Sequence, residues 1–249
     1  TFGHKPDATY IATGYVATAN TNGTWTVGEK TGVTLVAQVG VNKYESLADA
    51  LAAAKNGDTV KLVSGTTLAS SVEINKSITL DLNGKKLTNA NGEDTITVAL
   101  GASLTVTGSG TVDNVTHGKA DIYNNGTVIL NGGSYTRSQE KGVDKDNSGG
   151  NSYYNILNHG IMTIGENVSV TSSGHFSSLI ANGYYNFSDT NPRSGYVSGT
   201  NQESPELTIN GGTFEQQNFI AVKNDSNGEL TINGGTLTSK QSVVQNWNK

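Results

Sequence analysis

The sequence predicts an all-β protein in which short strands wind into a parallel β-helix, on the basis of composition, repetition and periodicity. The 249 residues include 31 Gly but only 3 Pro, and aromatic residues make up 7% of the chain. Good helix formers are concentrated in one short segment, which favours β structure elsewhere. The stretch LTINGGTF at 207–214 returns almost unchanged as LTINGGTL at 230–237. Self-similarity at such a fixed spacing, about 23 residues, is the signature of a repeat architecture.

The repeat extends through most of the chain when it is aligned on its glycine turn. The other copies are LDLNGKKL (80–87), LTVTGSGTV (104–112), VILNGGSY (128–135) and MTIGENVSV (162–170). Each copy carries two apolar residues two positions apart, and this alternation predicts a strand with one buried face. The pairs are Leu80/Leu82, Leu104/Val106, Val128/Leu130, Met162/Ile164, Leu207/Ile209 and Leu230/Ile232. A further apolar residue after the turn predicts a second strand; it is Leu87, Val112, Tyr135, Val168, Phe214 or Leu237.

A third strand with the pattern x-[IV]-x-N precedes the copies. It reads DIYN (121–124), NILN (155–158), LIAN (179–182), AVKN (221–224) and VVQN (243–246). Three short strands and three turns in about 23 residues form one coil of a parallel β-helix. Stacked coils place the aliphatic residues in inward columns and the asparagines in hydrogen-bonded ladders at a corner. A β-sandwich is the alternative, although sandwich strands rarely repeat their letters.

Two N-terminal elements are expected to close the first coil. Residues 1–39 lie outside the repeat, and YVATANTNGTWTV (15–27) predicts a β-hairpin that is an additional cap or the tail of a preceding module. Residues 40–249 form the β-helix, which begins with a helix from its N-cap Ser46 to about Lys55. The apolar stripe of this helix is Leu47, Ala50, Leu51 and Ala54. A solenoid needs such a cover because its first coil otherwise exposes its core and strand edges.

The segment Ala54-Lys55-Asn56-Gly57-Asp58-Thr59-Val60, followed by SITLDLNGKKL and the NGGTF-type coils, resembles the β-helix superfamily typified by pectate lyases. This resemblance implies a right-handed solenoid of about seven to eight coils over residues 40–249. The NGGTF coil is also similar to that of large surface proteins of Gram-positive gut bacteria. This similarity implies a secreted or cell-surface location. We expect the chain to be a monomeric piece of a longer bacterial surface protein.

The regular spacing is broken twice. Asn124 and Asn158 are 34 residues apart and Asn182 and Asn224 are 42 apart, against about 23 in a regular coil. The surplus lies at 137–151 and 183–205, and such insertions become surface loops that often carry function. They are expected to flank the face formed by strands 155–158 and 179–182. Because Tyr and Arg are typical of binding hot spots, the candidate binding residues are Tyr153, Tyr154, His175, Tyr184, Tyr185, Phe187, Arg193 and Tyr196.

Signals for chemistry are weak. The acidic residues are scattered, whereas pectate lyases hold calcium with a cluster of acidic side chains on one face. Asp144 and Asp146 resemble the start of a calcium loop, but Asn155 stands where such a loop needs a bidentate Glu, so no cofactor is expected. His159, in Asn158-His159-Gly160, is interpreted as an exposed turn residue.

The net charge of −5 and the lack of a basic cluster disfavour binding to nucleic acid. The sequence has no apolar run of about 18 residues, so membrane insertion is not expected. The favoured hypothesis is therefore a non-catalytic recognition module. Its partner is a host glycoprotein of the immunoglobulin or mucin type, or a glycan. The alternatives are a polysaccharide lyase or glycoside hydrolase on the same solenoid, and a passive spacer whose loops and aromatic residues serve only structure.

Overall fold

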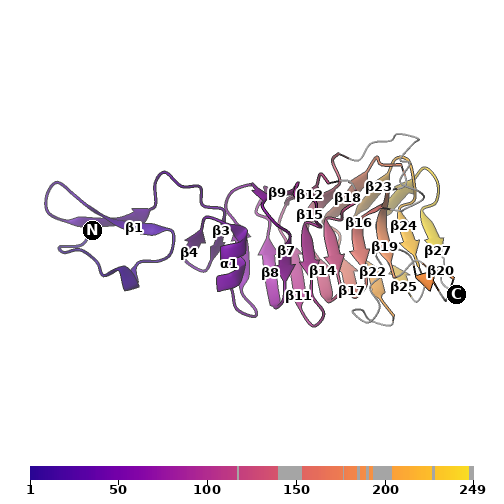
Figure 1. The fold of residues 1–249 in the computed structure, drawn as a ribbon, viewed down its shortest axis with the longest axis horizontal. Helices are drawn as coiled ribbons and strands as arrows, with labels where there is room; N and C mark the ends of the chain where they lie inside the picture. Colours follow the sequence, from indigo (N-terminus) through magenta and orange to yellow (C-terminus); the bar gives the residue numbers. More distant parts are fainter. Residues whose placement is uncertain are drawn as a thin grey trace.

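The protein is an elongated right-handed parallel β-helix with a small N-terminal module at one end, as the computed structural model shows (Figure 1). The predicted fold class is therefore confirmed. The structure describes residues 1–116, 118–139, 153–175, 177–183, 186–188, 191–192, 204–225 and 228–246. Within these residues each of the three sheets contains seven parallel strands, one from each coil, so the solenoid has seven coils.

Each coil contributes one strand to each of three sheets. Sheet one contains β5 (Thr59–Leu62), β8 (Ser77–Asp81), β11 (Ser103–Thr107), β14 (Thr127–Leu130), β17 (Ile161–Ile164), β22 (Glu206–Ile209) and β25 (Glu229–Ile232). Sheet two contains β6 (Thr66–Leu68), β9 (Lys85–Asn89), β12 (Gly110–Asn114), β15 (Gly133–Thr136), β18 (Val168–Ser172), β23 (Thr213–Gln216) and β26 (Thr236–Ser239). Sheet three contains β7 (Val72–Ile74), β10 (Ile96–Val98), β13 (Ile122–Asn124), β16 (Tyr153–Asn158), β19 (Ser177–Asn182), β24 (Val222–Asn224) and β27 (Val244–Asn246). A separate antiparallel pair joins β20 (Asn186–Ser188) and β21 (Asn191–Pro192).

The interior is built from columns of equivalent aliphatic side chains, because in-register parallel pairing sets each residue beside its counterpart in the next coil. The inner column of sheet three is Val72, Ile96, Ile122, Ile156, Ile180, Val222 and Val244. All of these are buried except Val244 in the last coil, which is 38% exposed. Since burial of apolar area is the main favourable contribution to folding, the columns account for most of the stabilisation of the coils.

The structure corrects the predicted equivalence of residues in two coils by two positions along the strand. Val170, and not Val168, pairs with Tyr135, because the turn from Ile164 is one residue longer than the turn from Leu130. Val168 is buried as well, but it pairs with Gly133. In the first copy, Ile78/Leu80 and not Leu80/Leu82 is equivalent to Leu104/Val106. Variable turn lengths shift the alignment of letters, whereas backbone pairing sets the true register.

An asparagine ladder runs along the corner between sheets three and one. Asn124 Nδ2 donates to Asn158 Oδ1 (2.7 Å), and Asn158 Nδ2 donates to Asn182 Oδ1 (2.7 Å). The ladder continues from Asn182 to Asn224 (2.9 Å) and from Asn224 to Asn246 (3.1 Å). The first four asparagines are buried. A buried amide without partners costs about 1–3 kcal/mol, so the ladder both satisfies the corner and specifies the coil spacing.

The N-terminal elements follow the prediction closely. The hairpin β1 (Tyr15–Ala19) and β2 (Trp25–Glu29) turns at Gly23, whose φ is +80°. A 3-10 turn, η1 (Ala8–Tyr10), precedes it. β3 (Ala37–Val39) pairs antiparallel with β4 (Asn42–Tyr44) and with β5, which extends sheet one past the first coil.

The capping helix α1 (Leu47–Ala53) starts at the predicted N-cap. The Asp49 N–H donates to Ser46 Oγ (3.0 Å). The helix ends before Lys55 because Ala54 is already extended, with ψ 146°. Leu47 and Ala50 are buried, so the predicted stripe does cover the core.

We predict that Asn158→Ala lowers the free energy of unfolding by about 2 kcal/mol or more, because it removes the ladder bond of Asn124 Nδ2 and leaves the buried Asn182 Oδ1 without its donor. The measurement is urea unfolding followed by circular dichroism. Asn233→Ala is the matched control, since Asn233 Nδ2 donates to Asn210 Oδ1 (2.8 Å) in an exposed ladder. It should cost less than about 0.5 kcal/mol. Equal losses for the two variants would contradict the structural role of the buried ladder.

Candidate functional site

The two insertions attach to opposite ends of neighbouring strands in sheet three. β15 ends at Thr136 and β16 begins at Tyr153, whereas β19 ends at Asn182 and β22 begins at Glu206. β16 and β19 are paired partners in parallel register and lie in the half of the solenoid nearer the C-terminal end (Figure 1). The irregular part of the chain therefore borders one sheet, at one end of each of two adjacent strands.

Four of the eight candidate binding residues lie outside the described residues, namely Tyr184, Tyr185, Arg193 and Tyr196, and so do Asp144 and Asp146. Tyr153 and Phe187 are placed by their backbone alone, in β16 and β20. Tyr154 and His175 are the two whose side chains the structure describes. The site is therefore built from these two residues and their neighbours.

Tyr154 and His175 meet through two residues that the sequence did not single out. Lys223 Nζ lies 5.9 Å from the centre of the Tyr154 ring and 5.7 Å from the centre of the Phe219 ring. The Phe219 ring is in turn 6.1 Å from the His175 ring. Such distances place the Lys223 ammonium group within cation–π range of two rings. We call Tyr154, His175, Phe219 and Lys223 the Tyr154 cluster.

The sequence held a weak signal for both missed residues. Lys223 is the variable position of the AVKN strand, where the other coils carry Tyr, Leu, Ala or Gln. It is nevertheless only 5% exposed. Phe219 lies in the turn just before that strand, and Gln216 Oε1 accepts hydrogen bonds from the N–H groups of Asn218 (2.5 Å) and Phe219 (2.8 Å). Tyr154 lies on β16 and Lys223 on β24, two strands along the same sheet, so only the stacking of the coils brings these residues together.

A buried polar corner lies between sheets two and three, where the chain leaves β15 and the first insertion begins. Arg137, which follows β15, is 1% exposed, and its Nη1 donates to Ser177 Oγ (2.5 Å). Asn155 Nδ2 donates to Asp121 Oδ2 (3.2 Å), and Asp121 is fully buried. Asp94 Oδ1 accepts from the Ala120 N–H (2.7 Å). Two carboxyl groups and one guanidinium group therefore share this corner.

Burial dominates the electrostatics of the corner. It raises the pKa of Asp121 well above the usual value, and the positive charge of Arg137 opposes this shift. Burial also raises the pKa of Asp94, which is half-buried, against the hydrogen bond from Ala120 and the charges of Lys119 and Arg137. A raised carboxyl pKa is one feature of general acids, and it also occurs in purely structural networks.

The prediction of an exposed His159 is wrong. Its side chain is 6% exposed, and its ring meets the Tyr123 ring edge to face, at 5.2 Å and 83°. His159 follows the ladder residue Asn158, and its N–H donates to Asn124 O (2.8 Å), so it does lie in the predicted turn. The outer side of this turn is covered, and burial lowers the pKa of His159 to about 4.

Comparisons of the chain with protein-family models, with curated proteins and with solved structures find no match. The coil geometry therefore assigns the chain to the parallel β-helix proteins and to no narrower family. No helix in the described part of the chain has the length and hydrophobicity that a membrane crossing requires. Among the same residues, no group of three or more His, Asp or Glu side chains is arranged to hold a metal ion.

We predict that acid destabilises the protein through His159. The pKa of His159 is about 4 in the folded state and 6.5 in the unfolded state, so the unfolded state binds a proton first as pH falls. The contribution of neutral His159 to the free energy of unfolding is therefore fully present above pH 6.5 and is lost as pH falls toward 4. Over this range the free energy of unfolding should fall by about 3 kcal/mol more in the wild type than in His159→Gln. Urea unfolding at a series of pH values measures this. The exposed His4→Gln should keep the wild-type dependence, and parallel curves for wild type and His159→Gln would contradict the burial argument.

We also predict strong coupling between Arg137 and Asp121. Arg137→Met should cost about 3 kcal/mol because it removes a buried guanidinium group that donates to Ser177 Oγ and whose positive charge favours the ionised form of Asp121. The double variant with Asp121→Asn should cost less than the sum of the single changes. A double-mutant cycle from urea unfolding tests this, and additive losses would show that the two groups do not interact.

Proposed function

We propose that this chain is a non-catalytic recognition module of a secreted or cell-surface bacterial protein. The rigid solenoid presents the insertions 137–151 and 183–205 to a host glycoprotein, of the immunoglobulin or mucin type, or to a glycan. One observation carries the proposal: both insertions attach to the adjacent strands β16 and β19, beside the Tyr154 cluster.

The scaffold supports this role physically. Buried columns and the asparagine ladder hold β16 and β19 in fixed register, so the attachment points of the insertions do not shift when a partner binds. Preorganised surfaces lose less conformational entropy on binding. The predicted aromatic residues add large contact areas at low entropy cost, and their hydroxyl groups can bond to sugar or peptide. The resemblance to surface proteins of gut bacteria supports the choice of a host partner.

The second candidate is a polysaccharide lyase or glycoside hydrolase. Its specific support is the pair Asp94 and Asp121, whose raised pKa values suit a general acid. Asp94 is half-buried and is therefore the carboxyl group of this pair with some access to solvent. Asp121 is fully buried and bonded to Asn155, an arrangement that favours a structural role for it.

We predict that replacing Tyr184, Tyr185 and Tyr196 together with Ala weakens binding to immunoglobulin, mucin or an array glycan by about tenfold or more, because aromatic contacts dominate such interfaces. Tyr154→Ala should weaken it as well. Surface plasmon resonance and a glycan array provide the measurement. Tyr10→Ala is the matched control, because Tyr10 is 88% exposed and belongs to the N-terminal module. Unchanged affinity of the triple variant for a partner that the wild type binds would overturn the assignment of the loops.

The same samples separate the alternatives. Release of unsaturated or reducing sugar ends from acidic or neutral polysaccharides, lost in Asp94→Asn, would establish the enzyme and contradict the non-catalytic module. An absence of both binding and turnover across the panel would support the passive spacer.

A further inference from the structure

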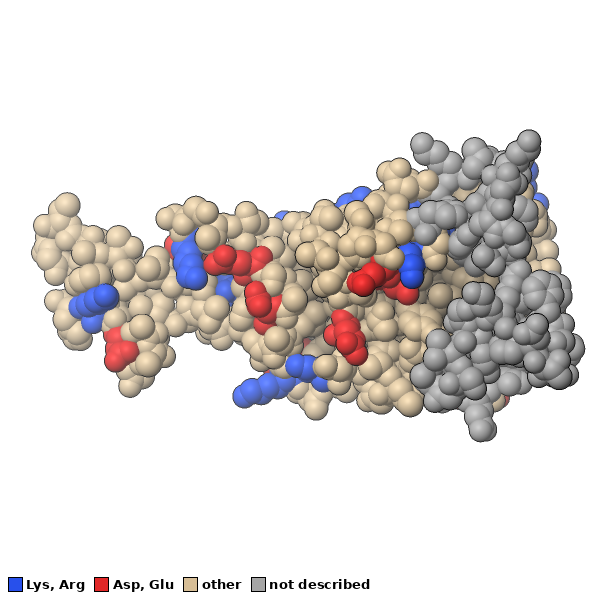
Figure 2. All heavy atoms as spheres, in the orientation of Figure 1, with Lys and Arg blue, Asp and Glu red and all other residues tan. Residues whose placement is uncertain are grey.

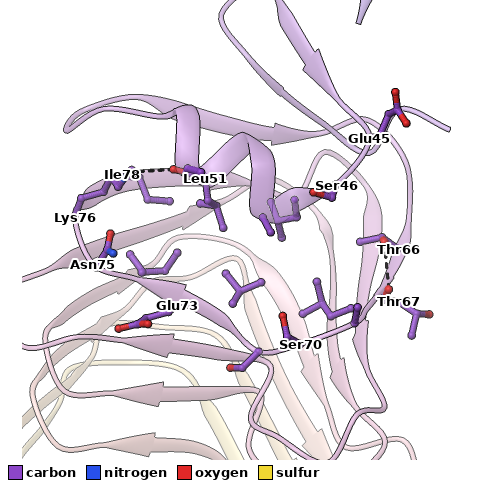
Figure 3. Close-up of a pocket in the computed structure, with 18 residues that line it drawn as sticks. Glu45, Ser46, Leu51, Thr66, Thr67, Ser70, Glu73, Asn75, Lys76 and Ile78 are labelled. Atoms are coloured by element: carbon purple, nitrogen blue, oxygen red, sulfur yellow. Dashed lines mark hydrogen bonds between the residues drawn. The ribbon is translucent and has the colours of Figure 1, made fainter. Parts of the chain in front are cut away.

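The N-terminal mouth of the solenoid is only partly covered. Sheet one continues past the first coil into β3 and β4, whereas sheets two and three end at β6 and β7 within the described residues. Helix α1 packs against β3, β4, β5 and β7. A cavity of about 440 Å³ remains between α1, β6 and β7 (Figure 3). This volume falls in the range of ordinary ligand pockets.

The cavity has apolar side chains on both of its sides, among polar ones, and α1 is held beside it. Leu47 and Leu51 of α1 face Leu68, Val72 and Ile74 of the first coil across it. Lys76 Nζ donates to the carbonyl oxygens of Leu51 (3.0 Å) and Ala54 (2.9 Å), and Figure 3 shows the bond to Leu51 at the end of the helix. Lys76 therefore ties the C-terminal end of α1 to the first coil, while the Ser46 cap stabilises the first turn of the helix itself. A shift of the C-terminal end of α1 toward β6 would break the two hydrogen bonds from Lys76.

Beside the cavity, β7 has an open edge. The Val72 N–H donates to Thr95 O (3.0 Å), and Ile74 O accepts from the Ala99 N–H (2.9 Å), so both groups face the next coil. Backbone groups of successive strand residues point to opposite sides, so the N–H and C=O of Glu73 face the mouth. No described strand pairs with this side of β7. An open edge of this kind is a template for an added strand.

The rim of the mouth is acidic. Glu45 and Glu73 line the cavity, and Asp49 lies on the first turn of α1. Figure 2 shows acidic side chains gathered over α1. Lys30 pairs with Glu45 (3.5 Å) and Lys76 binds the helix carbonyls, whereas no ion pair among the described residues engages Glu73 or Asp49. The excess of negative charge favours a basic partner.

We propose that the open edge of β7 and the cavity beneath α1 bind an extended basic peptide, which adds a strand to sheet three at the N-terminal mouth. Its backbone pairs with the N–H and C=O of Glu73. Two apolar side chains, two positions apart, continue the columns of Val72 and Ile74 into the cavity. Its Lys or Arg residues lie among the acidic side chains of the rim. This site is at the opposite end of the solenoid from the insertions and is independent of the function proposed for them.

The probe is the fluorescein-labelled peptide KTVTVTK, and its binding is followed by fluorescence anisotropy at low and high salt. We expect saturable binding that weakens with salt. Glu73→Pro removes the N–H that faces the mouth, and proline is tolerated on an edge strand. This variant should weaken binding about fivefold to tenfold. Glu73→Lys keeps the N–H and reverses the charge, so it should also weaken binding. Glu215→Lys, with the same charge change at an exposed position of β23, should bind as the wild type does.

Thermal unfolding confirms that each variant is folded, and Glu73→Lys keeps the test valid if proline is not tolerated. The peptide ETVTVTE should bind much more weakly than KTVTVTK. No saturable binding of KTVTVTK to the wild type would overturn the proposal. So would equal binding by Glu73→Lys and Glu215→Lys, because it would place the peptide elsewhere. Concentration-dependent dimerisation that Glu73→Lys abolishes would assign the edge to a second copy of the chain and would likewise overturn it.

Discussion

In-register parallel pairing is the constraint on which every other feature of this protein depends. Each residue of a coil lies beside its counterpart in the next coil, so a side chain must be compatible with its own neighbour in a stack. Aliphatic residues satisfy this by forming columns, and asparagines satisfy it because an amide can donate to one neighbour while it accepts from the other. The ladder from Asn124 to Asn246 is the clearest case, since it buries polar groups at a corner without leaving them unpaired.

The same constraint explains where the chain can depart from regularity. A coil can lengthen only at a corner, because extra residues within a strand would shift every side chain to the other face. Both insertions obey this rule, one before β16 and one after β19. The corner at which the chain leaves β15 carries Arg137, Asp121 and Asn155 and no asparagine ladder. The loss of regular stacking there is offset by a buried network of charges and hydrogen bonds.

The N-terminal end shows what happens where stacking begins. A first coil has no preceding coil to cover its core and edges, and the chain covers one sheet with β3 and β4 and part of the mouth with α1. The short helix leaves the edge of β7 and a cavity uncovered. The two candidate binding regions of the protein thus arise from one cause, an interruption of coil-on-coil stacking. One is an interruption along the solenoid and the other is at its end.

The amino-acid sequence by itself determined the fold class, the strands that carry the repeat, the ladder and the capping helix. These depend on local alternation, turn residues and a spacing that can be read along one chain. The tertiary structure decided the register of Val170 against Tyr135, because turns of unequal length disguise which residues are equivalent. It also decided the burial of His159 and the meeting of Lys223 with Tyr154 and Phe219. Burial and contact depend on what the other coils place above a residue, and no pattern within a single coil contains that information.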